Sequence, residues 1–157
     1  MKIMHACPVR CVTESLIVPI ARRAEYGDAD TLAFASLCAA YGAAGGLASA
    51  NKLVFDGDSR LAIGTIARWI VERQLILVHW GGDYWLPRFQ FAPTLVPHKE
   101  IAAPLSELRA VLDDWEIARW FSESNCWLGG RMPCAVILQA PGEVHNAARA
   151  LRFASRA

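Results

Sequence analysis

Two glycines near the middle of the chain separate two short runs of apolar, β-prone residues. The runs are LILVHW at 75–80 and YWL at 84–86, with Gly81, Gly82 and Asp83 between them. Because glycine adopts the left-handed conformations of a tight turn without strain, this arrangement predicts a β-hairpin. The other apolar residues mostly recur at the three- and four-residue spacing of amphipathic helices. The sequence therefore predicts a mainly α protein with one β-hairpin, at 75–86.

Helices are expected on both sides of this hairpin, bounded by capping residues, glycines and prolines. Before it, an arm at 1–12 precedes predicted helices at 13–23, from Asp28 or Asp30 to the glycines at 42–46, at 47–55, and at 60–73 with Ser59 as its cap. After it, an irregular connector at 87–100 precedes predicted helices at 101–112, 115–121 and 133–140, and a last helix that ends at Ala154.

The length and composition, 157 residues with 54% apolar, suit one globular domain or one core with a small appendage. We divide the chain into an arm with a short helix (1–27), a helical DNA-binding-like region with the hairpin (28–86) and a second helical region (87–157). The apolar segment at 15–21 is too short to span a membrane and is wrongly flanked for a signal peptide. We therefore expect a cytoplasmic protein with no membrane contact, and from the simple layout of the chain we expect a bacterial one.

The order of elements predicted over 47–86 is that of a winged helix-turn-helix, namely a short helix, a turn, a helix and a hairpin. In such modules the second helix enters the major groove and the hairpin touches phosphates. The candidate DNA-binding residues are Arg60, Thr65 and Arg68 in the groove and Arg73 near the DNA backbone. However, Lys and Arg total 16 against 15 Asp and Glu, whereas nucleic-acid binders usually carry a basic surplus. The alternative is an ordinary compact helical region whose arginines are solvated.

The sequence gives little support to an enzyme or a metal protein. It has no phosphate-binding loop, dinucleotide-binding motif, nucleophile elbow or zincin motif. The five cysteines have no regular framework, and His5, Cys7 and Cys11 have no second ligand pair at zinc spacing. A combination of Cys126, His145 and Asp114 arises readily by chance. We therefore expect no catalytic residues, no metal and no cofactor.

Five aromatic residues gather in and after the predicted hairpin: Trp80, Tyr84, Trp85, Phe89 and Phe91. Such residues stack on single-stranded bases when lysines or arginines are interleaved with them. Only Arg88 stands among them here. We therefore expect the aromatic residues to form a core between the hairpin and the helices.

A corner with two glycines separates two helical patterns near the C-terminus. After the helix predicted at 115–121, Trp127 and Leu128 form an apolar anchor, Gly129 and Gly130 turn the chain, and Pro133 suits the first turn of a helix. One interpretation is that the anchor holds two helices together. The other is that the corner presents a docking surface, because it places an aromatic ring and the guanidinium of Arg131 beside exposed backbone.

The corner also carries a family resemblance. The segment WEIARWFSESNCWLGGRMPCAVIL and the later EVHNAARA resemble the toxin-binding domain of Xre/MbcA/ParS-type antitoxins. The shared pattern is Asn-x-Trp-Leu-Gly-Gly-Arg-x-Pro between a Trp-led helix and a final helix with Ala-Ala-Arg. LPRFQF is similar to a Pro-x-Phe-Gln-Phe segment that often precedes that domain. The resemblance covers residues 86–152.

The resemblance implies a mostly helical, non-enzymatic antitoxin and transcriptional regulator. Such a protein binds a RES-type toxin that degrades NAD and represses its own promoter through operator DNA. The implied toxin-binding residues are Asn125, Trp127, Leu128, Gly129, Gly130, Arg131 and Pro133. We also expect a homo-oligomer. The alternative is an orphan interaction protein with neither a toxin nor a DNA role.

Overall fold

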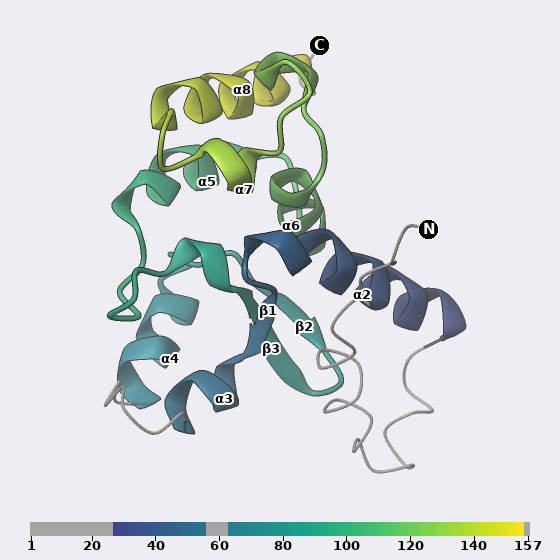
Figure 1. Ribbon diagram of the computed structural model, residues 1–157, viewed down its shortest axis with the longest axis vertical. Coiled ribbons are helices and arrows are strands. Elements are labelled where there is room, and N and C mark those ends of the chain that lie inside the picture. The colour runs from purple at the N-terminus through teal and green to yellow at the C-terminus, as the bar shows by residue number, and fades with distance from the viewer. Residues whose placement is uncertain (1–26, 56–62, 156–157) are drawn as a thin grey trace, which may run out of the picture.

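The structure, a computed structural model, describes residues 27–55 and 63–155 (Figure 1). The predicted arm at 1–12, the predicted helix at 13–23, the cap Ser59 and the candidate DNA contact Arg60 lie outside the described residues. The predicted fold class is confirmed: the described chain is mainly helical, with one hairpin in a small antiparallel sheet.

The N-terminal part of the described chain contains the sheet. Its elements are α2 (Asp28–Tyr41), β1 (Leu47–Ser49), α3 (Ala50–Phe55), α4 (Ile63–Val71), β2 (Val78–Trp80) and β3 (Asp83–Pro87). Short 3-10 helices lie at Gly42–Ala44 (η2), Arg88–Gln90 (η3) and Lys99–Ile101 (η4). The C-terminal part is helical, with α5 (Ala102–Leu108), α6 (Asp114–Ser122), η5 (Cys126–Leu128), α7 (Pro133–Val136) and α8 (Pro141–Ala154).

The predicted hairpin is confirmed in β2 and β3. Trp80 pairs with Asp83 across the turn, and the two turn glycines, Gly81 and Gly82, have φ of 64° and 78°. Both angles lie in the left-handed region, where a glycine lacks the Cβ that causes strain. The local sequence signal therefore identified the turn correctly.

The helix predicted over 47–55 is wrong in its first three residues, because Leu47–Ser49 forms the strand β1 and the helix α3 begins at Ala50. Leu47 pairs with Pro87 and Ser49 with Trp85, so β3 is the central strand in the order β1-β3-β2. The strand buries Leu47 and Ala48 in two different clusters. Pairing and burial on both faces outweigh the strong intrinsic helical preference of Leu47 and Ala48.

The sheet separates two apolar clusters. Successive side chains along the strands and the segment before β2 point alternately into one cluster and the other. Leu75, Leu77 and Leu86 belong to the cluster that contains Leu53 of α3 and Ile66 and Trp69 of α4. Ile76 and Val78, with Trp80 and Trp85, belong to the cluster that contains α2 and the C-terminal helices. Figure 1 shows α5 to α8 gathered on one side of the sheet and α3 and α4 on the other.

Most of the predicted aromatic core is confirmed. Phe34 of α2 stacks on Trp80 at a centroid distance of 4.2 Å and meets Trp85 edge-on at 5.1 Å. The ring centroid of Phe89 lies 5.8 Å from those of both Tyr41 and Phe121. The prediction is wrong for Tyr84, which is 42% exposed, because it lies on the opposite side of β3 from Trp85.

Several helices are shorter than their sequence patterns. Helix α4 ends at Val71 rather than at 73, because Arg73 adopts φ 55° and the Gln74 N–H donates to the Trp69 carbonyl at 2.9 Å. Helix α7 ends at Val136 instead of continuing to 140. The residue before Pro141, Ala140, has φ −137° and ψ 59°, since a following proline disfavours helical backbone.

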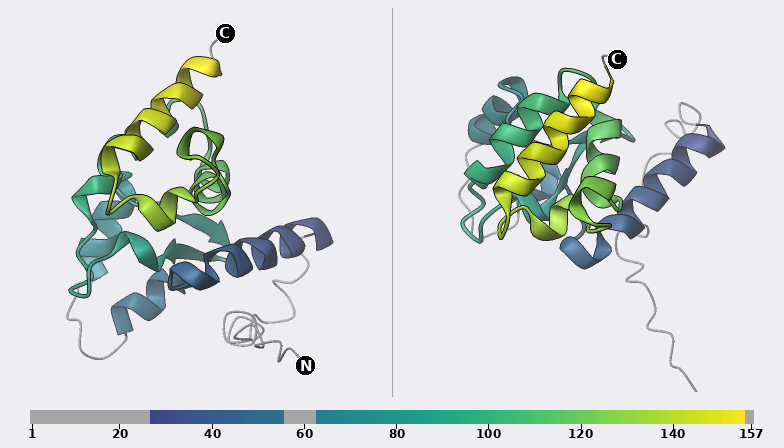
Figure 2. Two further views of the ribbon diagram at one scale, coloured as in Figure 1. Left: turned by 45° about the horizontal axis from the view of Figure 1, so that its top comes forward. Right: turned by 90° about the horizontal axis from the view of Figure 1, so that it is seen from above.

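The regions before and after residue 87 share buried contacts. The larger cluster contains Phe34, Leu37 and Tyr41 of α2 together with Ile117, Phe121 and Leu128. The Tyr41 hydroxyl donates to the Ala118 carbonyl at 2.5 Å, and burial raises the pKa of this phenol. Figure 2 shows the N-terminal end of α2 extending beyond the neighbouring helices.

Candidate functional site

The glycine corner begins where α6 ends. Asp113 caps this helix: its carboxylate accepts from the Glu116 N–H at 2.8 Å, while the Glu116 carboxylate accepts from the Asp113 N–H at 2.8 Å. This reciprocal capping box satisfies two backbone donors that a helix start leaves unpaired. Ile117, Ala118 and Phe121 bury the inner face of the helix. The helix that leads into the corner is therefore capped at its start and packed against the core along one face.

Asn125 organises the corner from within. Its side-chain oxygen accepts from the Trp127 N–H at 3.0 Å and so caps η5. Its carbonyl accepts from Leu128 at 3.1 Å and Gly130 at 2.9 Å, and its N–H donates to the Arg131 carbonyl at 3.1 Å. Asn125 is buried, at 7% exposure. Its role is to fix the backbone of the loop.

The two glycines are required by backbone conformation and not by lack of space. Gly129 and Gly130 have φ of 64° and 82°, both in the left-handed region. A Cβ built on either one would meet no atom within 4 Å. Other residues would be strained in this backbone although the surroundings are open. Both glycines are exposed, so the turn is part of the surface.

Trp127 and Leu128 are adjacent in sequence but have opposite environments. Leu128 is 1% exposed and belongs to the larger core cluster. Trp127 is 49% exposed, an unusual fraction for so large an apolar side chain. The buried leucine therefore anchors the corner, and the tryptophan is left for solvent or a partner.

Arg131 connects the corner to the last helix. Its Nε–H donates to the Leu128 carbonyl at 2.8 Å, and its Nη2 donates to a carboxylate oxygen of Glu143 in the first turn of α8. The two side chains remain 50% and 56% exposed. The guanidinium is thus held in place by the fold and still accessible.

The structure brings all of the predicted toxin-binding residues into this one corner. Asn125, Leu128 and Pro133 are buried, whereas Trp127, Gly129, Gly130 and Arg131 are exposed. Only the exposed members can contact a partner directly. The sequence analysis missed one residue that contacts the corner, Glu143, which pairs with Arg131. The acidic start of the last helix was a signal for Glu143.

The candidate DNA-binding residues are more scattered. Thr65 is half-buried and Arg68 is exposed on α4, the second helix of the predicted winged element. Arg73 lies beyond the end of α4, 62% exposed, with its guanidinium 4.0 Å from the Asp114 carboxylate of α6. Asp114 also accepts from Arg109 at 3.0 Å. Arg73 is therefore oriented towards the C-terminal helices.

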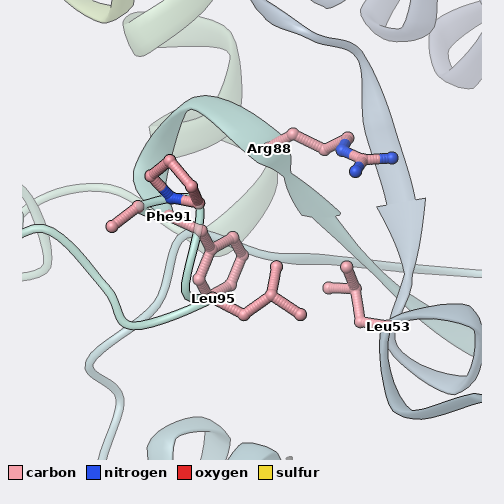
Figure 3. Close-up of a pocket in the computed structure, with 6 residues that line it drawn as sticks. Leu53, Arg88, Phe91 and Leu95 are labelled. Carbon is pink, nitrogen blue, oxygen red and sulfur yellow. The ribbon is translucent and has the colours of Figure 1, made fainter. Parts of the chain in front are cut away.

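A pocket of about 230 Å³ lies beside α3 and the connector after β3 (Figure 3). It is lined by Leu53, Arg88, Phe91, Ala92, Pro93 and Leu95. Figure 3 shows the guanidinium of Arg88 directed away from the ring of Phe91. The lining contains no carboxylate, thiol, hydroxyl or imidazole, so it offers no nucleophile or general base.

Metal-binding groups are not assembled among residues 27–55 and 63–155. No cluster there of three or more His, Cys, Asp or Glu side chains could hold a metal ion. His145 lies 3.5 Å from Glu107, and Asp114 bonds to Arg109, so each has its own partner in the fold. Burial raises the pKa of the Cys134 thiol, which disfavours a reactive thiolate there.

Comparisons with protein-family models, curated proteins and solved structures find no match to the chain. Among the described helices, none combines the length and the apolar character needed to cross a membrane. The observation that bears most on function is the corner itself, with an exposed tryptophan on a backbone fixed by Asn125 and two glycines.

Proposed function

We propose that this protein is a non-enzymatic antitoxin that binds and neutralises a RES-type, NAD-degrading toxin through the corner at 125–133. We further propose that it acts in the bacterial cytoplasm as a homo-oligomer. The observation that carries the proposal is the 49% exposure of Trp127 on this fixed corner. The resemblance of the corner to the toxin-binding domain of Xre/MbcA/ParS-type antitoxins supplies the class of partner.

The physical support lies in how the corner limits the entropy lost on binding. Tryptophan and arginine dominate binding energies at interfaces, since a partner's pocket desolvates a wide ring or a many-donor cation. Trp127 and Arg131 stand on a backbone that is already ordered by the hydrogen bonds of Asn125. A preorganised surface loses less conformational freedom on association than a flexible one. Arg131 also keeps donors free after its two intramolecular bonds.

The test is co-expression with a RES-domain protein encoded beside this chain's own gene. We expect the wild type to co-purify with that protein and to restore growth. Trp127→Ala should bind at least about 30-fold more weakly, as truncation of a hot-spot tryptophan does. Phe153→Ala is the matched control, because Phe153 is a 63% exposed aromatic residue on α8 outside the corner. Equal binding by Trp127→Ala and Phe153→Ala, at equal melting temperatures, would overturn the proposal.

A second function, repression of the protein's own promoter, is favoured by the winged element. The described order α2-β1-α3-α4-β2-β3, with the sheet order β1-β3-β2, places two helices on one face of a hairpin sheet. Arg68 is exposed on the second of these helices. Arg68→Ala should weaken binding to the DNA upstream of the gene without loss of helical content. Unchanged binding would remove Arg68 from the interface.

A further inference from the structure

The outer ends of β2 and β3 carry an exposed pair of polar-tipped aromatic side chains. His79 and Tyr84 face each other in the strand register, with ring centroids 5.3 Å apart at an interplanar angle of 60°. His79 is exposed, and Tyr84 is 42% exposed. Within the described residues, the structure records no hydrogen bond to the Tyr84 hydroxyl or to the His79 ring nitrogens. Their hydrogen-bonding groups are therefore available to a ligand.

The pair lies on the side of the sheet that α3 and α4 cover. Side chains alternate along a strand, so Tyr84 shares its face with Leu86 of the α3–α4 cluster. Trp80 and Trp85, on the other face, pack against Phe34 of α2. His79, which pairs with Tyr84, lies on the same side as α4, the candidate groove-entering helix.

Three cationic side chains that could attract an anionic ligand belong to α3, α4 and the segment after β3. Lys52 of α3, Arg68 of α4 and Arg88 after β3 are all exposed. Two acidic residues adjoin these elements in the sequence: Asp83, which accepts from the Tyr84 N–H at 2.8 Å, and Glu72, which accepts from the Gln74 side chain at 2.9 Å. The exposed carboxylates of Asp28 and Asp30 belong to α2, which packs on the opposite face.

We infer that the His79–Tyr84 pair is a second contact of the winged element with duplex DNA and binds its phosphate backbone. This inference rests on the promoter binding proposed above and adds residues to it. A tyrosine hydroxyl and an imidazole N–H both donate hydrogen bonds to phosphate oxygens. The ring contact orders both side chains before binding, and the turn at Gly81 and Gly82 carries no side chains that would obstruct the approach of a duplex.

The test places a positive or a negative charge at Tyr84 and, as a control, the same charges at Ser36 on α2, which packs on the other face of the sheet. The probe is a labelled duplex of the DNA immediately upstream of the gene, titrated between about 50 and 200 mM salt. Tyr84→Lys should tighten binding and steepen the log–log salt dependence by about 0.9, the release expected for one further phosphate contact. Tyr84→Glu should weaken binding. Ser36→Lys and Ser36→Glu, at an exposed position on α2, should each change the affinity much less.

A conservative variant separates the hydroxyl from the ring. Tyr84→Phe keeps the contact with His79 and so should keep the melting temperature, while it lowers the affinity about fivefold. Equal effects at Tyr84 and Ser36, or no effect at Tyr84 while Arg68→Ala still weakens binding, would overturn the inference and leave promoter binding intact. A wild type that binds no DNA at low salt would overturn both.

Discussion

The side-chain amide of Gln90 bonds to both backbone groups of Ile76, although 14 residues separate them in the chain. The Gln90 Nε2 donates to the Ile76 carbonyl at 2.9 Å, and the Gln90 Oε1 accepts from the Ile76 N–H at 2.8 Å. Gln90 is 1% exposed, so these bonds satisfy polar groups that water cannot reach. One side chain thus replaces a strand partner just before β2.

Gln90→Met should therefore destabilise the fold by about 2–4 kcal/mol, since it leaves the buried N–H and C=O of Ile76 without partners. Urea unfolding followed by circular dichroism measures the loss. Gln139→Met is the control, because Gln139 is exposed. Equal unfolding midpoints for the two variants would show that the Gln90 bonds contribute nothing net.

Gly82→Val should destabilise the hairpin by at least about 1–2 kcal/mol, because Gly82 has φ 78° and a branched residue is strained there. Gly142→Val is the control: its position lies in the first turn of α8, with no atom within 4 Å of a Cβ. Thermal unfolding compares them. A control that melts as low as Gly82→Val would remove backbone strain as the cause.

Cys126→Pro should stabilise the protein by about 0.4–1 kcal/mol, because proline reduces the freedom of the unfolded chain where the native backbone already fits. Cys126 is the first residue of η5, and Asn125 before it has φ −116° and ψ 124°, which a following proline favours. Ala135→Pro should destabilise instead, since the Ala135 N–H donates to the Met132 carbonyl at 3.0 Å. Differential scanning calorimetry measures the two melting temperatures. If both variants shift the melting temperature in the same direction, the backbone at Cys126 does not fit a proline as proposed.

Arg131→Ala should change the melting temperature little, because its partner Glu143 is 56% exposed and surface ion pairs contribute about 0–1 kcal/mol. It should nevertheless weaken the proposed toxin complex by about 2 kcal/mol and restore toxicity. Arg149→Ala, an exposed arginine elsewhere on α8, should retain both binding and neutralisation. If Arg131→Ala neutralises as well as wild type, Arg131 is not a hot spot.

A pH dependence is expected at Glu107, where hydrogen bonding from Arg152 on α8 lowers the pKa of the carboxyl. A lowered folded pKa means that the stabilisation is present above the unfolded pKa and is lost as the pH falls through the folded one. Glu107→Gln should therefore reduce stability at neutral pH and flatten the loss in acid. Urea midpoints at several pH values measure this, with Glu123→Gln as an exposed control. If the urea midpoints of wild type and Glu107→Gln fall in parallel as the pH is lowered, the lowered pKa of Glu107 does not contribute to stability.

The sequence by itself determined the features that depend on local conformation. The turn at Gly81 and Gly82 follows from a residue type that few other conformations accommodate. The start of α6 at Asp114, one residue before the helix predicted at 115–121, follows from the cap at Asp113. The glycine corner is another such case, since its two left-handed residues and the Asn125 cap lie within six residues of one another. These signals predicted the hairpin, the helix start and the backbone turn at the corner.

Tertiary structure alone decided the features that depend on distant partners. Leu47–Ser49 became a strand because β3 offered an open edge and two clusters to fill, and Arg73 was oriented towards Asp114 by the packing of α6. Tyr84 was left exposed because α2 packs on the other face of the sheet and the α3–α4 cluster does not include Tyr84. Trp127 and Leu128 are both apolar, yet only the packing of the C-terminal helices buries one and exposes the other. Burial depends on the whole assembled core, so the residues next to a side chain in the sequence do not determine whether it is buried.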